Sequence, residues 1–450
     1  MADKPATVEK TGIEHIPTEE RHGSPGRVFT LWFAANLTVA DYVIGVLCVQ
    51  AFGLTVAQSI PVLLLGNLLG GAVLGLSAAM GPKLGFPQML SSRSSFGRRG
   101  NYLFGGLNWI STVGWFTVNT ILGVEALQAV YPGANFYATA AGLVAVQVVV
   151  AVYGHDFIHL FEKVMSVVLG VLFIGVFLLT IPKIGAAFAF VPAGGSSGMP
   201  ALGAVGVVLA ASFSYLMSWS PYASDYSRYL PAGVSGKRVA LFALVGGAGA
   251  SFAIEVIGAL VGSLTPGAGF FTDLYNFAGW FGPLAIVAII LGALAANALN
   301  IYTNALSALV LDIRARRWLM VVVGGVVGLA LSFAGQANFV VNYQNFLFLL
   351  DYWITPWLGI VLVDYFVLRR TTVESSANPP LSDFRALGAY VVAILVSVPF
   401  MVPLNPVTGS ALGSPFGVLA YLFGGADFSY FISFGVAVAL AYLLRRKGPS

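Results

Sequence analysis

One carboxyl group stands inside the first long apolar stretch of the chain. Asp41 lies about 13 residues after that stretch begins, or close to 20 Å at about 1.5 Å per helical residue. An isolated carboxyl group inside a hydrocarbon layer must be protonated, paired or placed at a cation site. Asp41 is therefore our candidate for coupling to a proton or another cation. The alternative is a structural role, as the partner of a hydroxyl or amide group elsewhere.

A second candidate site combines an indole and an amide. Trp115 and Asn119 are four residues apart, so a helix places them on one face. Together they suit a flat, hydrogen-bonding heterocycle, because the indole can stack on the ring and the amide can bond to its edge. Trp219, Asn297 and Asn300 lie in two other apolar stretches and favour convergence on the same ligand. The alternative is ordinary packing for the tryptophans and interhelical hydrogen bonds for the asparagines.

The composition determines what kind of protein positions these residues. The chain has 450 residues, of which 58% are hydrophobic and only 9% are charged, and its mean hydropathy is +0.86. An average soluble protein is roughly 25% charged. Soluble enzymes, nucleic-acid binders and disordered proteins are therefore excluded. One cysteine cannot form an internal disulfide, and the four histidines, which fall in the N-terminal tail or near one helix end, indicate no metal centre.

Apolar stretches long enough to cross a membrane recur along the chain. A hydrocarbon core of about 30 Å needs roughly 20 apolar residues per helix. The sequence therefore predicts an all-α polytopic membrane protein with twelve transmembrane helices. We expect them at residues 28–52, 56–80, 101–130, 135–154, 160–182, 200–221, 238–264, 281–311, 318–335, 340–368, 386–404 and 428–444.

The basic residues support this topology. If both termini are cytoplasmic, every Lys and Arg except Lys183 falls on the inner side, as the positive-inside rule requires. We therefore expect residues 1–27 to form a flexible cytoplasmic tail, with no cleavable signal peptide, and residues 445–450 to form a second cytoplasmic tail. The predicted location is the cell membrane, plasma or inner, which the chain crosses several times.

Several classes of membrane protein lack support in this sequence. There is no Walker A motif, no arginine-repeat voltage sensor and no filter-like loop. No pairing of a nucleophile with a base, and no set of metal ligands, is seen at membrane depth, which disfavours an embedded enzyme. The remaining class is a secondary transporter.

Polar residues concentrate in the first, third, sixth, eighth and tenth predicted helices, and two runs there predict broken helices. Asn36 to Asp41, which includes Thr38, lies half-way through the first span and holds poor helix formers. The run from Ser218 to Pro221 also predicts an interruption, in the sixth helix, because proline removes a backbone hydrogen-bond donor. A ten-helix inverted repeat breaks its first and sixth helices at the midplane, where the freed backbone groups bind ligand and ion. The alternative for the sixth helix is a simple proline kink.

Several segments resemble signatures of one transporter family. They are WFAANLTVADYVIGVLCVQAFGL (32–54), FGRRGNYLFG (96–105), VGWFTVNT (113–120), SWSPYASDYSRYLP (218–231), AANALNIYTNALSALVLD (295–312) and DYWITPWLGIVLVDYF (351–366). On these motifs the chain is identified as a member of nucleobase–cation symporter family 1, the purine and cytosine permeases. The resemblance, which runs from about residue 28 to 440, implies a LeuT-type 5+5 inverted repeat plus two C-terminal helices. The repeats would be 28–185 and 200–368, followed by 386–444.

The resemblance also implies a substrate site between the first, third, sixth and eighth helices. Trp115 matches the aromatic residue that stacks on the base, and Asn119 takes the place of the amide that bonds to its edge. Trp219 matches the aromatic residue of the sixth helix. Asn300, or Asn297 if the alignment shifts, matches the asparagine of the eighth. We include Thr38, from the first helix, in the predicted substrate site.

One departure from the family pattern concerns the coupling ion. The resemblance implies that sodium-coupled members of the family carry hydroxyl residues in the eighth helix. At the matching positions this chain has Ala295 and Ala296. A hard cation prefers oxygen ligands, so this loss weakens a sodium site. Asp41 offers a titratable group instead. Proton coupling is therefore expected rather than sodium coupling.

The sequence as a whole predicts a proton-coupled symporter that imports a nucleobase by alternating access. The substrate would be cytosine or a purine such as adenine, guanine or hypoxanthine. The alternative within the same family is a transporter of allantoin, hydantoin or uracil, possibly coupled to sodium. The expected partners are the small-molecule base and the lipid bilayer. Neither a cofactor, nor nucleic acid, nor an obligate protein partner is expected.

Overall fold

A computed structural model describes residues 9, 11–192, 201–265, 267, 269–337 and 339–446. The parts of the predicted tails at 1–8, 10 and 447–450, and the predicted start of the sixth helix at residue 200, lie outside the described residues. Within the described part the fold is built from helices, with one isolated bridge between Leu404 and Ala411. The all-α class is therefore confirmed.

The first predicted span is two helices, α1 (Pro25–Ala35) and α2 (Val39–Gln50), bent by 54° at the break between them. The other long helices coincide with the remaining predicted stretches. They are α3 (Val56–Leu84), α6 (Tyr102–Val130), α7 (Phe136–Tyr153), α8 (His155–Thr180), α10 (Ala201–Met217), α12 (Gly236–Leu264), α14 (Gly282–Val310), α15 (Arg317–Gly335), α16 (Phe339–Leu362), α18 (Phe384–Ser397) and α19 (Ser429–Arg445).

Short helices complete the chain between these elements. They are η1 (Thr18–Glu20), α4 (Gln88–Ser91), α5 (Arg93–Phe96), η2 (Ile181–Lys183), α9 (Ile184–Ala189), η3 (Ser220–Tyr222), α11 (Ala223–Ser227), α13 (Phe270–Ala278), η4 (Gly279–Phe281), α17 (Val373–Ala377), η6 (Val398–Phe400) and η7 (Ala420–Phe423). A π-helical turn, η5 (Val363–Val367), follows α16.

Nine helices of the described chain are long and apolar enough to cross a membrane, or ten when α1 and α2 form one span. The shorter apolar helices α18 and α19 account for the last two predicted stretches. Every predicted stretch is thus a helix, whereas the count of twelve crossings stays a prediction. The start of α8 differs from the prediction because Gly154, at φ +94°, turns the chain directly from α7 into α8 at His155.

The packing of the helices repeats itself with an offset of five spans. The paired elements α1 and α2 pack on α12, and α10 and α11 pack in the same way on α3. Likewise α7 packs on α14, and α15 packs on α6. In the contacting pairs α3–α12 and α6–α14, the shift by five spans exchanges the two helices of the pair. This is the pattern of an inverted repeat. The limits 28–185 and 200–368 stay predictions.

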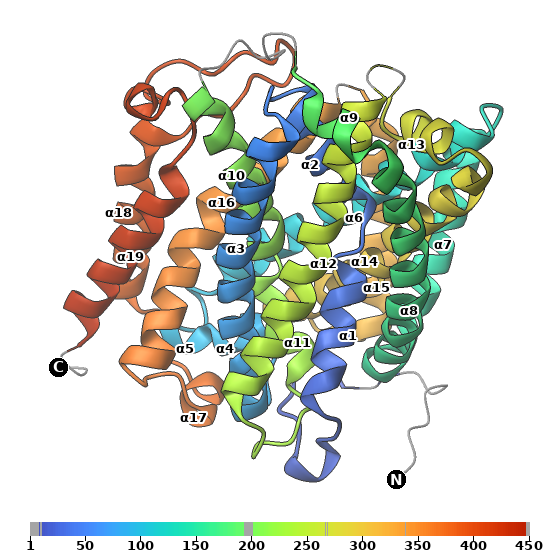
Figure 1. The fold of residues 1–450 in the computed structure, drawn as a ribbon. Coiled ribbons are helices and arrows are strands. Elements are labelled where there is room, and N and C mark those ends of the chain that lie inside the picture. The colour runs from blue at the N-terminus through green and yellow to red at the C-terminus, as the bar shows by residue number, and fades with distance from the viewer. Residues whose placement is uncertain are drawn as a thin grey trace.

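The two added helices lie outside the repeat. Figure 1 shows α18 and α19 beside α16 at one edge of the bundle, and α7 and α8 at the opposite edge. Helix α1 begins and α19 ends at the same end of the bundle (Figure 1), which we call the terminal end. An even number of crossings requires this arrangement.

The N-terminal tail differs from the prediction. Residues 11–24 and Glu9 pack on the terminal end of the bundle instead of forming a flexible tail, and Ile16 is fully buried. Arg21 donates to the carbonyl of Pro82, at the end of α3, over 2.6 Å. The prediction of flexibility rested on polar composition and was wrong for these residues, because their polar groups have partners on the bundle.

Asp364 lies near the end of the tenth predicted helix, where a charged side chain is commonly solvated. It is fully buried in η5, where Arg445 donates to both of its oxygens over 3.0 and 2.7 Å. The third nitrogen of the same guanidinium group, Nη1, lies 2.6 Å from Asp383, before α18. One guanidinium group therefore joins α16, α18 and α19 at the terminal end.

Helices α2 and α12 touch through their backbones. A Cβ atom at Gly45 would overlap the carbonyl oxygen of Glu255, and one at Gly258 would overlap the carbonyl oxygen of Tyr42. Small residues of this kind let membrane helices approach closely. The contact matters because it presses the first residues after the break, including Asp41, against α12.

This contact gives a stability prediction on one helix. Gly258→Ala should destabilise the protein by about 1–3 kcal/mol, because the added methyl group forces α2 and α12 apart. Gly249→Ala, also on α12, meets no atom within 4 Å and should be neutral or slightly stabilising. Thermal unfolding of the two purified variants provides the comparison. Equal melting temperatures would show that the close contact is not needed.

Candidate functional site

The first break lies between α1 and α2 and is held by side chains. The Thr38 hydroxyl caps α2 by accepting from the backbone N–H of Asp41 at 3.4 Å. Asn36 donates its amide to the carbonyl of Trp32 over 2.7 Å. The predicted break is confirmed, although it is shorter than the predicted run, because α2 resumes at Val39 and so includes Asp41.

The second break follows α10 and lies against the first. Helix α10 ends at Met217, and the chain passes through Trp219 and the single turn η3, which contains Pro221, into α11. The hydroxyl groups of Thr38 and Tyr215, in the last turn of α10, form a 2.7 Å hydrogen bond. The α-helix is therefore interrupted here by a single 3₁₀ turn, and the two breaks share one contact.

A row of amides links α6 to α14 and then to the second break. Asn119 donates to the Asn297 side-chain oxygen over 3.1 Å, and Asn300 donates to the same oxygen over 3.4 Å. Tyr222, in η3, donates its hydroxyl to Asn300 over 3.1 Å. Asn297 in turn donates to the carbonyl of Phe116 over 3.0 Å. Both candidate asparagines of the eighth predicted helix thus belong to one network.

Each of the two tryptophans packs against a tyrosine beside a break. Trp115 packs edge-on against Tyr215, with ring centroids 5.2 Å apart. Trp219 packs edge-on against Tyr222 at 5.4 Å and against Trp32 at 5.3 Å. All six predicted substrate residues therefore belong to two chains of contacts beside the two breaks, and we call the two chains together the central ring. Its members are Thr38, Trp115, Asn119, Tyr215, Trp219, Tyr222, Asn297 and Asn300.

The central ring has unused hydrogen-bonding capacity. The indole N–H of Trp115 and the side-chain oxygen of Asn119 are buried and have no partner among the described residues. Three more buried groups near the breaks also lack a partner among the described residues. They are the indole N–H of Trp32, the side-chain oxygen of Asn36 and the hydroxyl of Ser220. Buried polar groups almost always have partners, so such a concentration of donors and acceptors indicates a polar ligand site.

Asp41 contacts α12. Its Oδ2 accepts from Ser251 over 2.7 Å, and Glu255 follows Ser251 by one helical turn. Glu255 accepts from Asn67 of α3 and, over 3.1 Å, from Ser212 of α10. The two carboxyl groups are fully buried, and no ion pair within the described residues includes either one. They form one polar layer across α2, α3, α10 and α12.

The eighth predicted helix meets the first break without hydroxyl groups. A Cβ atom at Gly292 of α14 would overlap the carbonyl oxygen of Leu37, so the two backbones touch there. Ala295 and Ala296, about one turn later, are fully buried. Beside the break these positions of α14 supply methyl groups, which cannot bind a hard cation.

Glu9 joins the tail to four helices at the terminal end. Its carboxylate accepts from the hydroxyl groups of Tyr229 at 2.5 Å and Tyr302 at 3.1 Å, and from the backbone N–H of His155 at 2.9 Å. Arg228 and Arg317 lie 3.7 and 3.8 Å from its two oxygens. The tail therefore holds the end of α11, which follows the second break, together with α8, α14 and α15.

A carboxylate at Asp312 ties the start of α6 to the end of α14 nearby. Burial alone would raise the pKa of Asp312, but hydrogen bonds from Arg98, Tyr102 and Arg93 lower it to about 2. The carboxylate therefore stays charged at physiological pH. It lines a hollow of about 810 Å³ that Glu9 and Glu14 also line.

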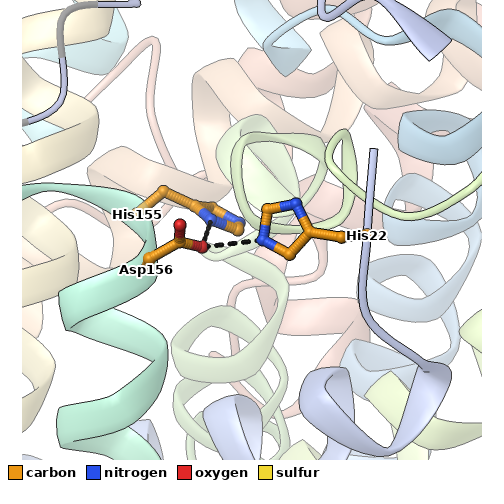
Figure 2. A group of neighbouring side chains, drawn as sticks. All are labelled: His22, His155 and Asp156. Atoms are coloured by element: carbon orange, nitrogen blue, oxygen red, sulfur yellow. Dashed lines mark hydrogen bonds and ion pairs between the residues drawn. The ribbon is translucent and has the colours of Figure 1, made fainter. Parts of the chain in front are cut away.

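Two histidines meet one carboxylate beside this tail. Figure 2 shows His22, from the tail, and His155, at the start of α8, both directed at the same oxygen of Asp156. The distances are 2.9 Å to His22 Nε2 and 3.2 Å to His155 Nδ1. The sequence indicated no metal centre because 134 positions separate His22 from Asp156.

Sequence reasoning missed several residues of these networks. Tyr215 and Tyr222 belong to the central ring, and Tyr222 stands inside the quoted motif at 218–231, so an aromatic residue next to the proline was a usable signal. Glu9 carried no signal because it lies in a polar segment. Asp351 remains without a partner for either oxygen within the described chain, although it is buried in α16.

Comparison with known proteins now places this fold and its site. Residues 15–433 match the family model described as "Permease for cytosine/purines, uracil, thiamine, allantoin". The chain belongs to this permease family. It is accordingly a multi-pass membrane transporter and not an enzyme.

Relatives and solved structures agree with the family. The chain is 30% identical to the "putative purine-cytosine permease YxlA" of Bacillus subtilis, over 98% of this chain and 96% of that protein. It is 27% identical to the purine-cytosine permease fcyB of Emericella nidulans, over 98% and 88%.

Among solved structures, one similar fold is that of the nucleobase-cation-symport-1 transporter Mhp1, in a closed conformation with bromovinylhydantoin bound. The match has a TM-score of 0.78 and 21% identity, and it covers 98% of this chain and 95% of that chain. A sodium-coupled sialic acid symporter matches at a TM-score of 0.64 and 13% identity, over 95% and 90%. The LeuT-type inverted repeat is thereby confirmed.

The Glu9 network gives a prediction for the terminal end. Glu9→Gln removes the charge that faces Arg228 and Arg317, so the tail should hold the second break less firmly. A cysteine introduced at the buried Ser220, with Cys48 replaced by alanine, should then react with an alkylating reagent at least several times faster.

Glu19→Gln is the matched control, because Glu19 is exposed in η1 of the same tail. Labelling rates are measured on purified protein by mass spectrometry. The same rate in both variants would mean that Glu9 does not hold the terminal end closed.

Proposed function

We propose that this transporter imports cytosine or a purine base, such as adenine, guanine or hypoxanthine, by symport with protons. The observation that carries the proposal is the central ring, where aromatic surfaces and unpartnered donor and acceptor atoms surround the two helix breaks. A nucleobase has the matching properties, since it is flat and carries both donors and acceptors on its edge. The printed names of the purine-cytosine permease relatives support the same substrate class.

In this proposal each residue of the central ring has a role. Trp115 and Trp219 supply the apolar surfaces for the faces of the base, since aromatic rings gain from stacking. Asn119 binds the edge of the base and is positioned by Asn297. Asn300 holds Tyr222 and thereby the second break, while Thr38 holds the first.

A second substrate class within the family remains a candidate. The family description includes uracil and allantoin, and the similar Mhp1 structure holds a hydantoin. These compounds are also flat rings with alternating N–H and C=O groups. Uptake of labelled cytosine by cells or proteoliposomes, with unlabelled cytosine, adenine, guanine, hypoxanthine, uracil, allantoin and hydantoin as competitors, separates the two. Competition by allantoin or hydantoin alone would overturn the nucleobase assignment.

Proton coupling is proposed from the polar layer of Asp41 and Glu255. Two unpaired carboxylates buried side by side would be costly, and one proton shared with the layer removes most of that cost. Ser251 links the layer to Asp41, and Asp41 lies three residues after Thr38 of the central ring. The methyl groups of Ala295 and Ala296 argue against sodium at the neighbouring face.

The orientation is part of the same proposal. We place the terminal end in the cytoplasm, because the basic residues then fall inside. Import from outside follows from this placement. The predicted location in the cell membrane, plasma or inner, goes with it.

The substrate role of Asn119 can be separated from its structural role. Asn119→Ala should weaken base binding by about 5- to 150-fold, which corresponds to the roughly 1–3 kcal/mol lost with one hydrogen-bonding partner. Asn108→Ala is the matched control, since Asn108 is also a buried amide of α6 that donates to α14, through Ser307. Binding is measured by competition in membranes with equal protein content. Equal losses in both variants would assign Asn119 to helix packing.

The coupling role of Asp41 gives a transport prediction. Wild-type uptake should persist without sodium and collapse with a protonophore. Asp41→Asn should lose accumulation against a gradient but keep exchange of internal for external base, because the substrate ring stays intact.

Asp351→Asn is the control, as another buried carboxyl group outside the polar layer. Accumulation as in the wild type would make Asp41 structural and move the test to Glu255. Loss of all uptake on removal of sodium would instead support sodium coupling.

A further inference from the structure

We propose that His22, His155 and Asp156 form a binding site for a divalent transition-metal ion such as Zn²⁺, which fastens the N-terminal tail to the terminal end of the bundle. The ligand atoms would be His22 Nε2, His155 Nδ1 and the shared oxygen of Asp156 (Figure 2). These three atoms lie within 4.8 Å of one another. Metal-bound water would complete the coordination.

The hydrogen bonds of the two histidines leave a lone pair on each ring facing the carboxylate. His22 Nδ1 lies 2.8 Å from the carbonyl oxygen of Glu20, and His155 Nε2 lies 3.3 Å from that of Tyr226. A carbonyl oxygen only accepts, so each of these nitrogens carries a proton, and a ring that holds no second proton is neutral. The other nitrogen of each neutral ring, which faces Asp156, is then an acceptor.

The three ligand atoms converge on one point, where either ring protons or a metal ion can lie between them. The Asp156 oxygen is 2.9 Å from one nitrogen and 3.2 Å from the other, which is near the separation of about 3.4 Å between ligands around a tetrahedral zinc ion at 2.1 Å. Metal-binding histidines typically donate their other N–H to a backbone carbonyl or carboxylate, as both of these rings do. The arrangement therefore has the inner ligands and the supporting hydrogen bonds of a metal site.

The surroundings define the kind of ion. Two imidazoles and one carboxylate suit zinc and similar transition metals, whereas magnesium and calcium prefer sets of oxygen ligands. Arg27 and Lys163 line the hollow beside Asp156 and disfavour weakly held cations. The same hollow, of about 420 Å³, gives an ion access to the carboxylate.

An ion here would act on the terminal end as a whole. His22 belongs to the tail, Asp156 and His155 begin α8, and the carbonyl of Tyr226 belongs to α11, just after the second break. The ion would therefore hold the tail, α8 and α11 together, next to the Glu9 network. Release of a base toward this end would be slower with the ion bound. This effect on transport rests on the proposed function, whereas the binding of the ion does not.

Binding is tested on the purified protein after treatment with a chelator. Titration calorimetry with ZnCl₂ should give one ion per chain, and zinc, but not magnesium, should raise the melting temperature. His22→Ala and Asp156→Asn should each weaken zinc binding by at least about tenfold, since each removes a ligand. Both positions are only half-buried, so folding should survive.

Two further variants make the result specific to coordination. His22→Cys should retain zinc binding, because a thiolate is also a zinc ligand, whereas His22→Gln should lose it. His15→Ala, in the same tail but outside the cluster, should bind zinc as the wild type does. The proposal is overturned if zinc binds no better to the wild type than to His22→Ala, if His15→Ala loses it equally, or if acidification alone stabilises the protein and zinc adds nothing.

Discussion

A backbone group without a partner costs several kcal/mol inside a hydrocarbon layer, and this structure interrupts two of its helices there. The interruption at residues 36–38 is possible because Thr38 caps α2 and Asn36 bonds back to Trp32. The hydroxyl of Thr38 also reaches Tyr215, so the two breaks stabilise each other. The polar side chains needed for this purpose bring Trp115, Trp219 and the amides of α6 and α14 to the same place. The candidate site is thus a consequence of how the broken helices satisfy their backbone.

The proposed coupling layer is joined to this region by very few atoms. Asp41 donates its backbone N–H to Thr38, while its side chain accepts from Ser251. The close contact at Gly45 and Gly258 keeps larger side chains out of the layer between α2 and α12. A change in the charge of Asp41 would therefore be felt at the cap of α2, and from there at Tyr215, without any long relay.

The sequence was sufficient for features that depend on composition and local propensity. Twelve apolar stretches, the break near Thr38 and the break near Pro221 all follow from hydropathy, proline and poor helix formers. The six predicted substrate residues were chosen because amides, a hydroxyl and indoles in such helices suit a flat polar ligand, and polar residues are rare and expensive there. That they meet in the central ring is a tertiary fact, since Asn119 and Asn297 are 178 positions apart.

Other features had no local signal. Asp364 and Arg445 each looked like an ordinary charge near a helix end, and only their mutual approach buries both. Glu255 had no visible partner because Asn67 and Ser212 come from two other helices. The tail looked flexible because its composition is polar, whereas its polar groups find fixed partners on the bundle.

The docking of this tail also sets an order of assembly. Glu9 is synthesised long before the residues that it contacts, and 308 positions separate it from Arg317. At about 5–20 residues per second, roughly 15 to 60 s pass between the two. Until then the Glu9 network lacks Arg317, which the finished protein buries. The sealing of the terminal end is therefore among the last events of biosynthesis, after α15 has emerged from the ribosome.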